Sequence, residues 1–251
     1  MKIREIFSKS ILTKTAISGF DYCLNPYVGC GHGCLYCYAS FIKRFTGHKE
    51  PWGYFVDVKI NAPNLLFKQI KRATPGIVAL STITDPYQPL EKHYKLTRRC
   101  LEILLDYQFP INILTRSSLC LRDIDLFKKF NEIEVGVTIT TNDDNIRRIF
   151  EPRSPSIQLR IDALKSLQQE NIKTYAFIGP ILPLDPLKLV EMLKGIVNEI
   201  LIDRMNYTNR IKRVYEREGL NLYLEDRYFR LIGLELKERF EKSGIPVFMC
   251  F

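Results

Sequence analysis

Short runs of β-branched and aliphatic residues alternate with amphipathic helical patterns along most of this chain. The runs at 76–81, 111–115, 134–139, 173–178, 199–203 and 246–249 predict strands. The segments 95–107, 123–131, 156–170, 187–197 and 228–243 predict helices. Such alternation is typical of βα units with parallel strands, so the pattern predicts an α/β fold.

The length and composition indicate one globular domain. A chain of 251 residues, 46% hydrophobic and 26% charged, buries a sizeable core and is not expected to be disordered. We expect a single domain over 1–251, with its core at about 12–206 and a C-terminal helical extension and last strand at 207–251.

The charge balance permits an anionic partner without requiring one. The formal net charge is +9, but the basic residues occur mostly as scattered pairs, which solvated helix faces explain equally well.

No apolar run reaches the ~20 residues that a membrane span needs, and the N-terminus lacks an apolar leader segment. The expectation is therefore a cytoplasmic protein that does not span a membrane.

The densest chemical signal is a glycine-rich stretch, 25–39, that contains Cys30, Cys34 and Cys37 in the spacing C-x3-C-x2-C. A chain of this length does not need disulfides, and three cysteines within eight residues favour metal binding in a reducing compartment. The glycines permit the tight backbone that three converging thiolates require. Three ligands on a four-iron cluster leave one iron open for chemistry.

A zinc site is the structural alternative. Cys23 or His32 would then complete a four-ligand set with the three clustered cysteines. Structural zinc sites usually use two C-x2-C-type pairs, which this chain does not have.

The loop resembles the radical S-adenosylmethionine (SAM) superfamily, whose motif is C-x3-C-x-Φ-C with an apolar or aromatic residue at Φ. Tyr36 is the Φ residue in this chain. The resemblance implies a [4Fe-4S] cluster on Cys30, Cys34 and Cys37, with SAM on the fourth iron and its adenine against Tyr36. It also implies an enzyme that cleaves SAM reductively to a 5′-deoxyadenosyl radical, which takes hydrogen from a substrate.

Five further stretches resemble the branch of this superfamily that contains spore photoproduct lyase. They are 81–91, 114–118, 122–125, 137–141 and 151–156, and the agreement extends from about 12 to 206. The fold that this implies is a partial (β/α)6 barrel of the TIM type, with the cluster at its carboxyl-terminal (top) face.

The same resemblance implies a set of SAM-binding residues at strand ends. Ser81 and Thr84 correspond to a loop that contacts the methionyl group, and Arg116 to a lysine that pairs with its carboxylate. Thr138 corresponds to a ribose contact, and Gly179 to a small residue that admits the nucleoside. Each residue also has a plain structural interpretation: Thr138 as packing, Arg116 as a partner for a local carboxylate, and Gly179-Pro180 as a turn.

One position departs from spore photoproduct lyase. A cysteine that returns a hydrogen atom to the product corresponds to Thr82 in this chain, whose O–H bond is too strong for that role. We therefore expect a different activity. Cys120, in the loop after another predicted strand, is a candidate hydrogen donor, with an ordinary semi-buried thiol as the alternative.

The substrate is open at this stage. The resemblance and the charge favour a nucleic acid, and a peptide or small metabolite is the alternative within radical SAM enzymes. A non-catalytic iron-sulfur or zinc protein is the alternative from another class. A one-electron donor of ferredoxin or flavodoxin type is implied as a partner, while the oligomeric state is not indicated.

Overall fold

The computed structural model describes residues 1–251 and is built around one eight-stranded sheet. Its strand order is β11-β10-β9-β8-β7-β6-β3-β2, and every neighbouring pair from β3 to β11 is parallel. The strands are β2 (Leu12–Lys14), β3 (Tyr22–Leu24), β6 (Val78–Leu80), β7 (Ile111–Thr115), β8 (Ile133–Thr138), β9 (Lys173–Ile178), β10 (Glu199–Ile202) and β11 (Val247–Met249). Because β2 and β11 are the ends of this order, the sheet is open, as in the partial barrel that was expected.

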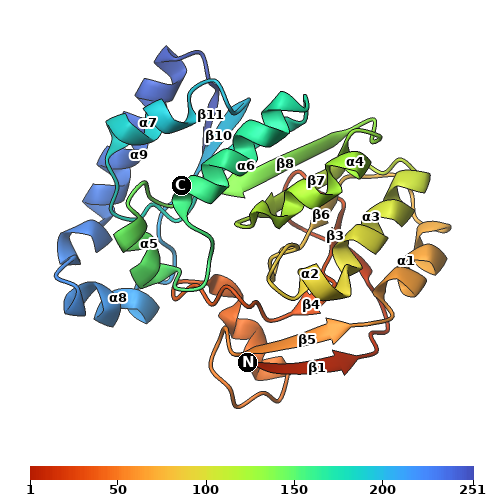
Figure 1. Cartoon of the computed structure of the whole chain (residues 1–251). Coiled ribbons are helices and arrows are strands. Elements are labelled where there is room, and N and C mark those ends of the chain that lie inside the picture. Colours follow the sequence, from red (N-terminus) through yellow and green to blue (C-terminus); the bar gives the residue numbers. More distant parts are fainter.

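Helices follow the parallel strands and cover the sheet. They are α1 (Ala62–Ile70), α2 (Glu91–Tyr94), α3 (Leu96–Asp106), α4 (Ile124–Phe127), α5 (Asp144–Phe150), α6 (Ile157–Gln169), α7 (Pro186–Leu193), α8 (Thr208–Arg217) and α9 (Asp226–Lys242). Figure 1 shows α3, α4 and α6 along the sheet, with α7 and α9 beside its β10–β11 edge. None of these helices combines the length and apolar character that crossing a membrane requires.

Helix α6 illustrates why the periodic pattern was informative. Ile157, Ile161, Leu164 and Leu167 are all buried, and Ser156 caps the helix by accepting a hydrogen bond from the backbone of Leu159. One face of the helix thus packs on the sheet while its amino end is closed by a side chain.

The first 75 residues contain structure that the pattern did not predict. Strands β1 (Lys2–Ile6), β5 (Phe55–Lys59) and β4 (Tyr27–Val28) form a separate small sheet, seen below the main sheet in Figure 1. A 3-10 helix, η1 (Tyr38–Phe45), follows the cysteines. Two further 3-10 segments are η2 (Ser118–Asp123) and η3 (Asn221–Leu224). Helix α4 is shorter than the predicted 123–131 because the chain turns at residues 128–129 and leaves the helix.

The topology brings five loops to one end of the sheet. Ser81, Arg116, Gly179 and Asp203 each directly follow a parallel strand, and Thr138 is the last residue of another. In open α/β sheets this carboxyl end is where ligands bind. The cysteine loop lies between β4 and η1 and faces the same end.

Candidate active site

The cysteine loop depends on two glycines with left-handed backbone. Gly29 has φ +88°, and a Cβ there would lie 2.5 Å from the carbonyl oxygen of Phe55. Gly33 has φ +62° and packs against the guanidinium of Arg153. Only glycine fits both positions without strain, so the sequence of this loop follows from its close packing.

Two polar side chains hold the loop in place. The backbone N–H of Gly31 donates to Oε1 of Gln88 over 2.9 Å, and the Thr84 hydroxyl donates to the carbonyl of Gly29 over 2.6 Å. Gln88, which is fully buried, also donates to Thr84 over 3.1 Å. The hydroxyl of Thr84 is therefore used to position the cysteine loop, and Gln88 is a site residue that the sequence pattern did not reveal.

One cavity of about 590 Å³ opens at the carboxyl ends of the strands. Nine of the ten residues singled out from the sequence line it; they are Cys30, Cys34, Tyr36, Cys37, Ser81, Thr84, Arg116, Thr138 and Gly179. They come from the cysteine loop and from four different strand ends. Among these nine residues, Cys30 and Gly179 lie farthest apart in the chain, at 149 positions.

Polar atoms without partners point to a polar ligand in this cavity. Ser81 Oγ, Arg116 Nε, Thr138 Oγ1 and Trp52 Nε1 are buried, make no hydrogen bond and belong to lining residues. Ser81 is also held at φ +70°, an uncommon conformation for a residue with a side chain. Because native proteins pair nearly all buried polar groups, such a cluster indicates donors and acceptors kept for a bound molecule.

Arg116 shares a buried network with Glu151, which lies between α5 and α6. The Arg116 Nε lies 3.5 Å from Glu151 Oε1, and its Nη2 donates to the Tyr36 hydroxyl over 3.1 Å. Glu151 also accepts hydrogen bonds from Tyr36, Arg160 and Thr140. Burial would raise the pKa of Glu151, but the charges of Arg160 and Arg116 lower it to about 2, so the carboxylate is ionised at neutral pH.

Asp85 fixes the backbone at the end of β7. Its carboxylate accepts from the Thr115 hydroxyl over 2.6 Å and from the backbone N–H of Arg116 over 2.9 Å. His32, in the cysteine loop, lies 3.5 Å away. Burial alone would raise the pKa of Asp85, yet His32 and these hydrogen bonds lower it to about 2. The ionised Asp85 therefore links the cysteine loop to the base of Arg116.

The loop cysteines and Cys23 lie in different surroundings. No group of three or more His, Cys, Asp or Glu side chains is close enough to share one metal ion. Cys23 lies on β3 beside Thr13 and does not line the cavity. Burial raises the pKa of all three loop thiols, that of Cys37 to about 12, so proton release would accompany metal binding.

Comparison with known proteins agrees with this geometry. Residues 24–194 match the model of the family described as "Radical SAM superfamily". The chain belongs to the radical SAM superfamily. Members use SAM and an iron-sulfur cluster for radical chemistry and need an electron donor, and this chain is an enzyme of that kind.

Relatives of this radical SAM chain occur in archaea, bacteria and viruses. An uncharacterised protein of Methanocaldococcus jannaschii is 45% identical over 184 residues, which are 73% of this chain and 69% of the relative. One of Mycobacterium bovis is 29% identical over 189 residues, 71% of this chain and 56% of the relative. A protein of Pseudomonas phage M6, named "Radical SAM Nalpha-GlyT isomerase", is 27% identical over 72% of this chain and 35% of its own length.

Solved structures share the radical SAM fold. Spore photoproduct lyase complexed with dinucleoside spore photoproduct superposes with a TM-score of 0.71 at 15% identity, over 98% of this chain and 82% of that one. Streptococcus suis SuiB bound to its precursor peptide SuiA superposes with a TM-score of 0.60 at 12% identity, over 91% of this chain and 48% of that one. At these identities the likeness concerns the fold alone.

Cys120 is the one candidate residue that the structure does not bring to the radical SAM cavity. It lies in η2, has no exposed surface and packs in the hydrophobic core. Burial raises the pKa of its thiol to about 12. Cys100 is similarly buried in α3, and the exposed Cys250 follows β11.

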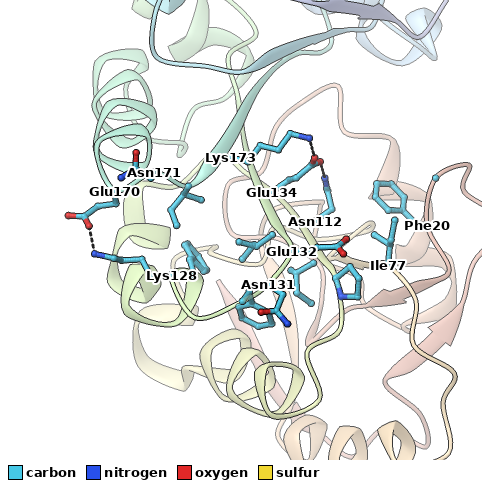
Figure 2. Close-up of a pocket in the computed structure, with 17 residues that line it drawn as sticks. Phe20, Ile77, Asn112, Lys128, Asn131, Glu132, Glu134, Glu170, Asn171 and Lys173 are labelled. Atoms are coloured by element: carbon cyan, nitrogen blue, oxygen red, sulfur yellow. Dashed lines mark hydrogen bonds and ion pairs between the residues drawn. The ribbon is translucent and has the colours of Figure 1, made fainter.

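A second cavity, of about 730 Å³, lies at the amino ends of the strands. Figure 2 shows two ion pairs among its charged residues, Lys128 with Glu170 at 2.7 Å and Lys173 with Glu134, while Glu132 has no ion pair. Asn112 also donates to Glu134 over 3.3 Å. No buried unpartnered polar atom belongs to a residue of this cavity. This cavity therefore has fewer free hydrogen-bonding groups for a ligand than the smaller cavity at the carboxyl ends of the strands.

Proposed function

We propose that Cys30, Cys34 and Cys37 hold a [4Fe-4S] cluster whose fourth iron is open to SAM. The observation that carries this proposal is that three cysteines and the unpartnered polar groups of Ser81, Arg116 and Thr138 share one cavity. When bound, the reduced cluster and SAM supply a carbon radical that removes a hydrogen atom from the substrate.

The residues of this chain bind and orient the cofactor. The Nε of Arg116 makes no hydrogen bond, although it lies 3.5 Å from Glu151, and the side chain suits the methionyl carboxylate, since a guanidinium grips a carboxylate with paired hydrogen bonds. The free hydroxyls of Ser81 and Thr138 suit the polar atoms of the methionyl and ribose groups. Gly179 lines the same cavity, and the ring of Phe177 fills the space that a Cβ at this position would take. Tyr36, tied to Glu151, offers a fixed ring at the cavity wall.

The direct test is cofactor cleavage by protein reconstituted without oxygen. Protein loaded with iron and sulfide and reduced with dithionite should convert SAM to methionine and 5′-deoxyadenosine without added substrate. Cys34→Ala protein, taken through the same steps, should form neither product. Uptake of one zinc per chain with no bound iron would refute the proposal.

The substrate that we propose is a nucleic acid. Tyr207 and Arg204 line the cavity, and the Tyr207 side chain is 59% exposed. The Arg210 guanidinium lies 4.9 Å from the centre of the Tyr207 ring and also contacts Ser40 on η1. An exposed ring beside guanidinium groups suits a stacked base and its phosphate. The complex of spore photoproduct lyase with a dinucleoside lends this support by analogy.

Salt dependence separates this substrate from a neutral peptide or metabolite. Binding of a fluorescent single-stranded oligonucleotide should weaken steeply between about 50 and 200 mM salt. Removing one phosphate contact in Arg210→Ala should lower the slope of log K against log salt by about 0.7. The control is Arg239→Ala on α9, where the arginine pairs with Glu235. Equal slopes for all three proteins would contradict a phosphate contact at Arg210.

Spore photoproduct itself is not the substrate that we propose. Thr82 lines the cavity and contacts the Asn25 amide at 3.4 Å, but its O–H bond is too strong to donate a hydrogen atom. Given the lesion, the protein should form little intact thymine dinucleotide, and Thr82→Cys should form more. Clean repair by the unmodified protein would show that another residue donates the hydrogen, and Cys120→Ala would test the buried candidate.

A further inference from the structure

The cysteine loop is a thin wall with two different faces. Cys34, Tyr36 and Cys37 line the cavity on its inner face, whereas Gly33 and Leu35 do not. The Leu35 side chain is instead 44% exposed on the outside of the protein. Leu35 is bonded directly to Cys34, so an exposed residue stands next in the chain to a cysteine assigned to the cluster.

Neighbouring segments extend this outer face. The Leu35 N–H donates to the carbonyl of Phe150 over 2.9 Å, which brings Leu35 beside the exposed Pro152 and Arg153. The Arg153 guanidinium packs on Gly33 and Gly53 and lies 4.3 Å from the centre of the Tyr54 ring, which is 52% exposed. We call the surface made by Leu35, Tyr54, Pro152 and Arg153 the outer loop face.

Arg153 is a cation without an internal partner. Two nearby arginines, Arg147 and Arg148, pair with Asp144 at 2.9 and 3.4 Å. The Arg153 side chain, by contrast, makes no hydrogen bond or ion pair, and its guanidinium is held over the loop by packing on Gly33 and Gly53 and by the Tyr54 ring. A guanidinium fixed beside exposed apolar groups is suited to an acidic group on another molecule.

We infer that the outer loop face docks an acidic one-electron carrier protein that reduces the cluster; this rests on the function proposed above. In each encounter the reduced flavin or iron-sulfur centre of the carrier loses one electron and the cluster gains it, with no bond made or broken. Electron transfer slows steeply with distance, and this face approaches Cys34 through one residue. The cavity side is reserved for SAM and substrate.

The size and charge of the face fit such a partner. Electron-transfer encounters are weak and use small interfaces, below about 1,200 Å², and they gain their speed from electrostatic steering. Leu35, Tyr54 and Pro152 provide a small apolar centre, and Arg153 provides the steering charge. A nucleic acid bound here would lie on the far side of the wall from the cavity, so the substrate does not account for this surface.

The experiment compares two reductants on each variant. Rates of 5′-deoxyadenosine formation are measured with reduced flavodoxin, an acidic carrier, and with dithionite. For Arg153→Glu we expect the flavodoxin rate, divided by the dithionite rate of the same variant, to fall on the order of tenfold at low salt, with the loss shrinking as salt rises. Arg153→Lys, which keeps the charge, should retain most of the flavodoxin rate.

The control for net charge is Arg217→Glu on α8, whose arginine is 68% exposed and pairs with Glu218. Both rates should match those of the unmodified protein. Iron content and the midpoint potential of the cluster are measured for every variant. Carbodiimide coupling of the Arg153→Lys side chain to flavodoxin carboxylates should yield a one-to-one adduct, whether or not SAM is cleaved.

Several results would overturn the inference. An equal fall of both rates together with a shifted potential would assign Arg153 to tuning the cluster. Unchanged rates with weaker oligonucleotide binding would assign the face to nucleic acid. If the unmodified protein binds iron but no dithionite-driven cleavage occurs, the proposed function fails by itself, and the coupling experiment still decides whether this face docks the carrier.

Discussion

The cavity at the carboxyl end of the parallel sheet contains buried polar atoms without hydrogen bonds, whereas the cavity at the amino end contains none. At the carboxyl end, Thr138 on β8 is fully buried and its hydroxyl has no partner. At the amino end, Thr174 on β9 is also fully buried, but its hydroxyl donates to the carbonyl of Ile196 over 3.2 Å. The same residue type, equally buried on neighbouring strands, is satisfied at one end only.

This difference identifies the end that was built for a ligand. An unsatisfied buried hydroxyl costs about 1–3 kcal/mol of stability, so a cluster of such groups is retained only where something else repays the loss. The amino end has the larger of the two cavities, but four of its five charged side chains pair with one another. Cavity size is therefore the poorer guide here, and unpartnered polar atoms are the better one.

The largest expected effect concerns the cysteines. Cys34→Ala should abolish the iron-sulfur absorbance and all 5′-deoxyadenosine formation, because the cluster loses one of only three ligands. The matched control is Cys120→Ala, in the hydrophobic core away from the cavity. It should keep the full iron content. Loss of iron in the Cys120 variant as well would remove the distinction between cavity and core thiols.

The next effect compares two carboxylates. Glu151, fully buried, pairs with Arg160, so Glu151→Gln should lower the free energy of unfolding by about 3–5 kcal/mol. Glu134, at the amino end, is 33% exposed and pairs with Lys173, so Glu134→Gln should cost about 0–1 kcal/mol. Urea unfolding at neutral pH measures both. Similar losses of unfolding free energy in the two variants would contradict the difference between the buried and the exposed ion pair.

The same pair gives a pH test. The pKa of Glu151 falls from 4.5 to about 2 on folding, so its ionisation stabilises the protein fully above pH 4.5, and this contribution is lost as the pH falls towards 2. Unfolding free energies measured over this window should decline less steeply in Glu151→Gln than in the unmodified protein.

Arg116 should have an intermediate effect on the cofactor. Arg116→Ala should weaken SAM binding by about 1.5–3 kcal/mol, the value of a charge-assisted hydrogen bond, and Arg116→Lys should restore part of the loss. The control is Lys173→Ala, at the amino end of the sheet. Equilibrium binding to the cluster-loaded protein gives the affinities, and an unchanged affinity in Arg116→Ala would remove this residue from the site.

The smallest expected effects concern Thr138 and Thr174, the two threonines compared above. Thr138→Val removes an unpartnered hydroxyl, so it should leave the stability of the cofactor-free protein unchanged or higher while weakening SAM binding by about 0.5–1.5 kcal/mol. Thr174→Val removes a bonded hydroxyl and should destabilise the protein by a similar amount without affecting SAM. Thermal unfolding gives the stability of each variant, and titration with SAM gives the affinity of each for the cofactor.

The parallel sheet was predictable because its strands are locally encoded. The bounds of β7 and β9 agree with the sequence pattern, since β-branched runs between turn residues mark buried strands. The small sheet was not predictable in this way. Its β1 pairs with β5 some 53 residues later, and the buried Asp57 in β5, bonded to Arg4 and His48, breaks the apolar pattern.

The candidate site also contains residues that could be predicted from the sequence and residues that could not. Residues at strand ends, such as Arg116 and Thr138, could be placed near the cysteines from topology and resemblance. The supporting residues could not, because their roles depend on contacts between distant segments. Gln88 acts on Gly31 across 57 positions, and Glu151 on Tyr36 across 115. Ser154, whose hydroxyl lies 3.7 Å from the Cys34 sulfur, acts across 120.

The most direct measurement is the electron paramagnetic resonance spectrum of the reduced, cluster-loaded protein with and without SAM. If three cysteines leave one iron open beside the unpartnered groups of the cavity, saturating SAM should shift the g-values of the reduced cluster, and the shift should require a higher SAM concentration in Arg116→Ala. A reduced cluster whose spectrum is identical with and without SAM would contradict a cofactor site at the carboxyl end of the sheet.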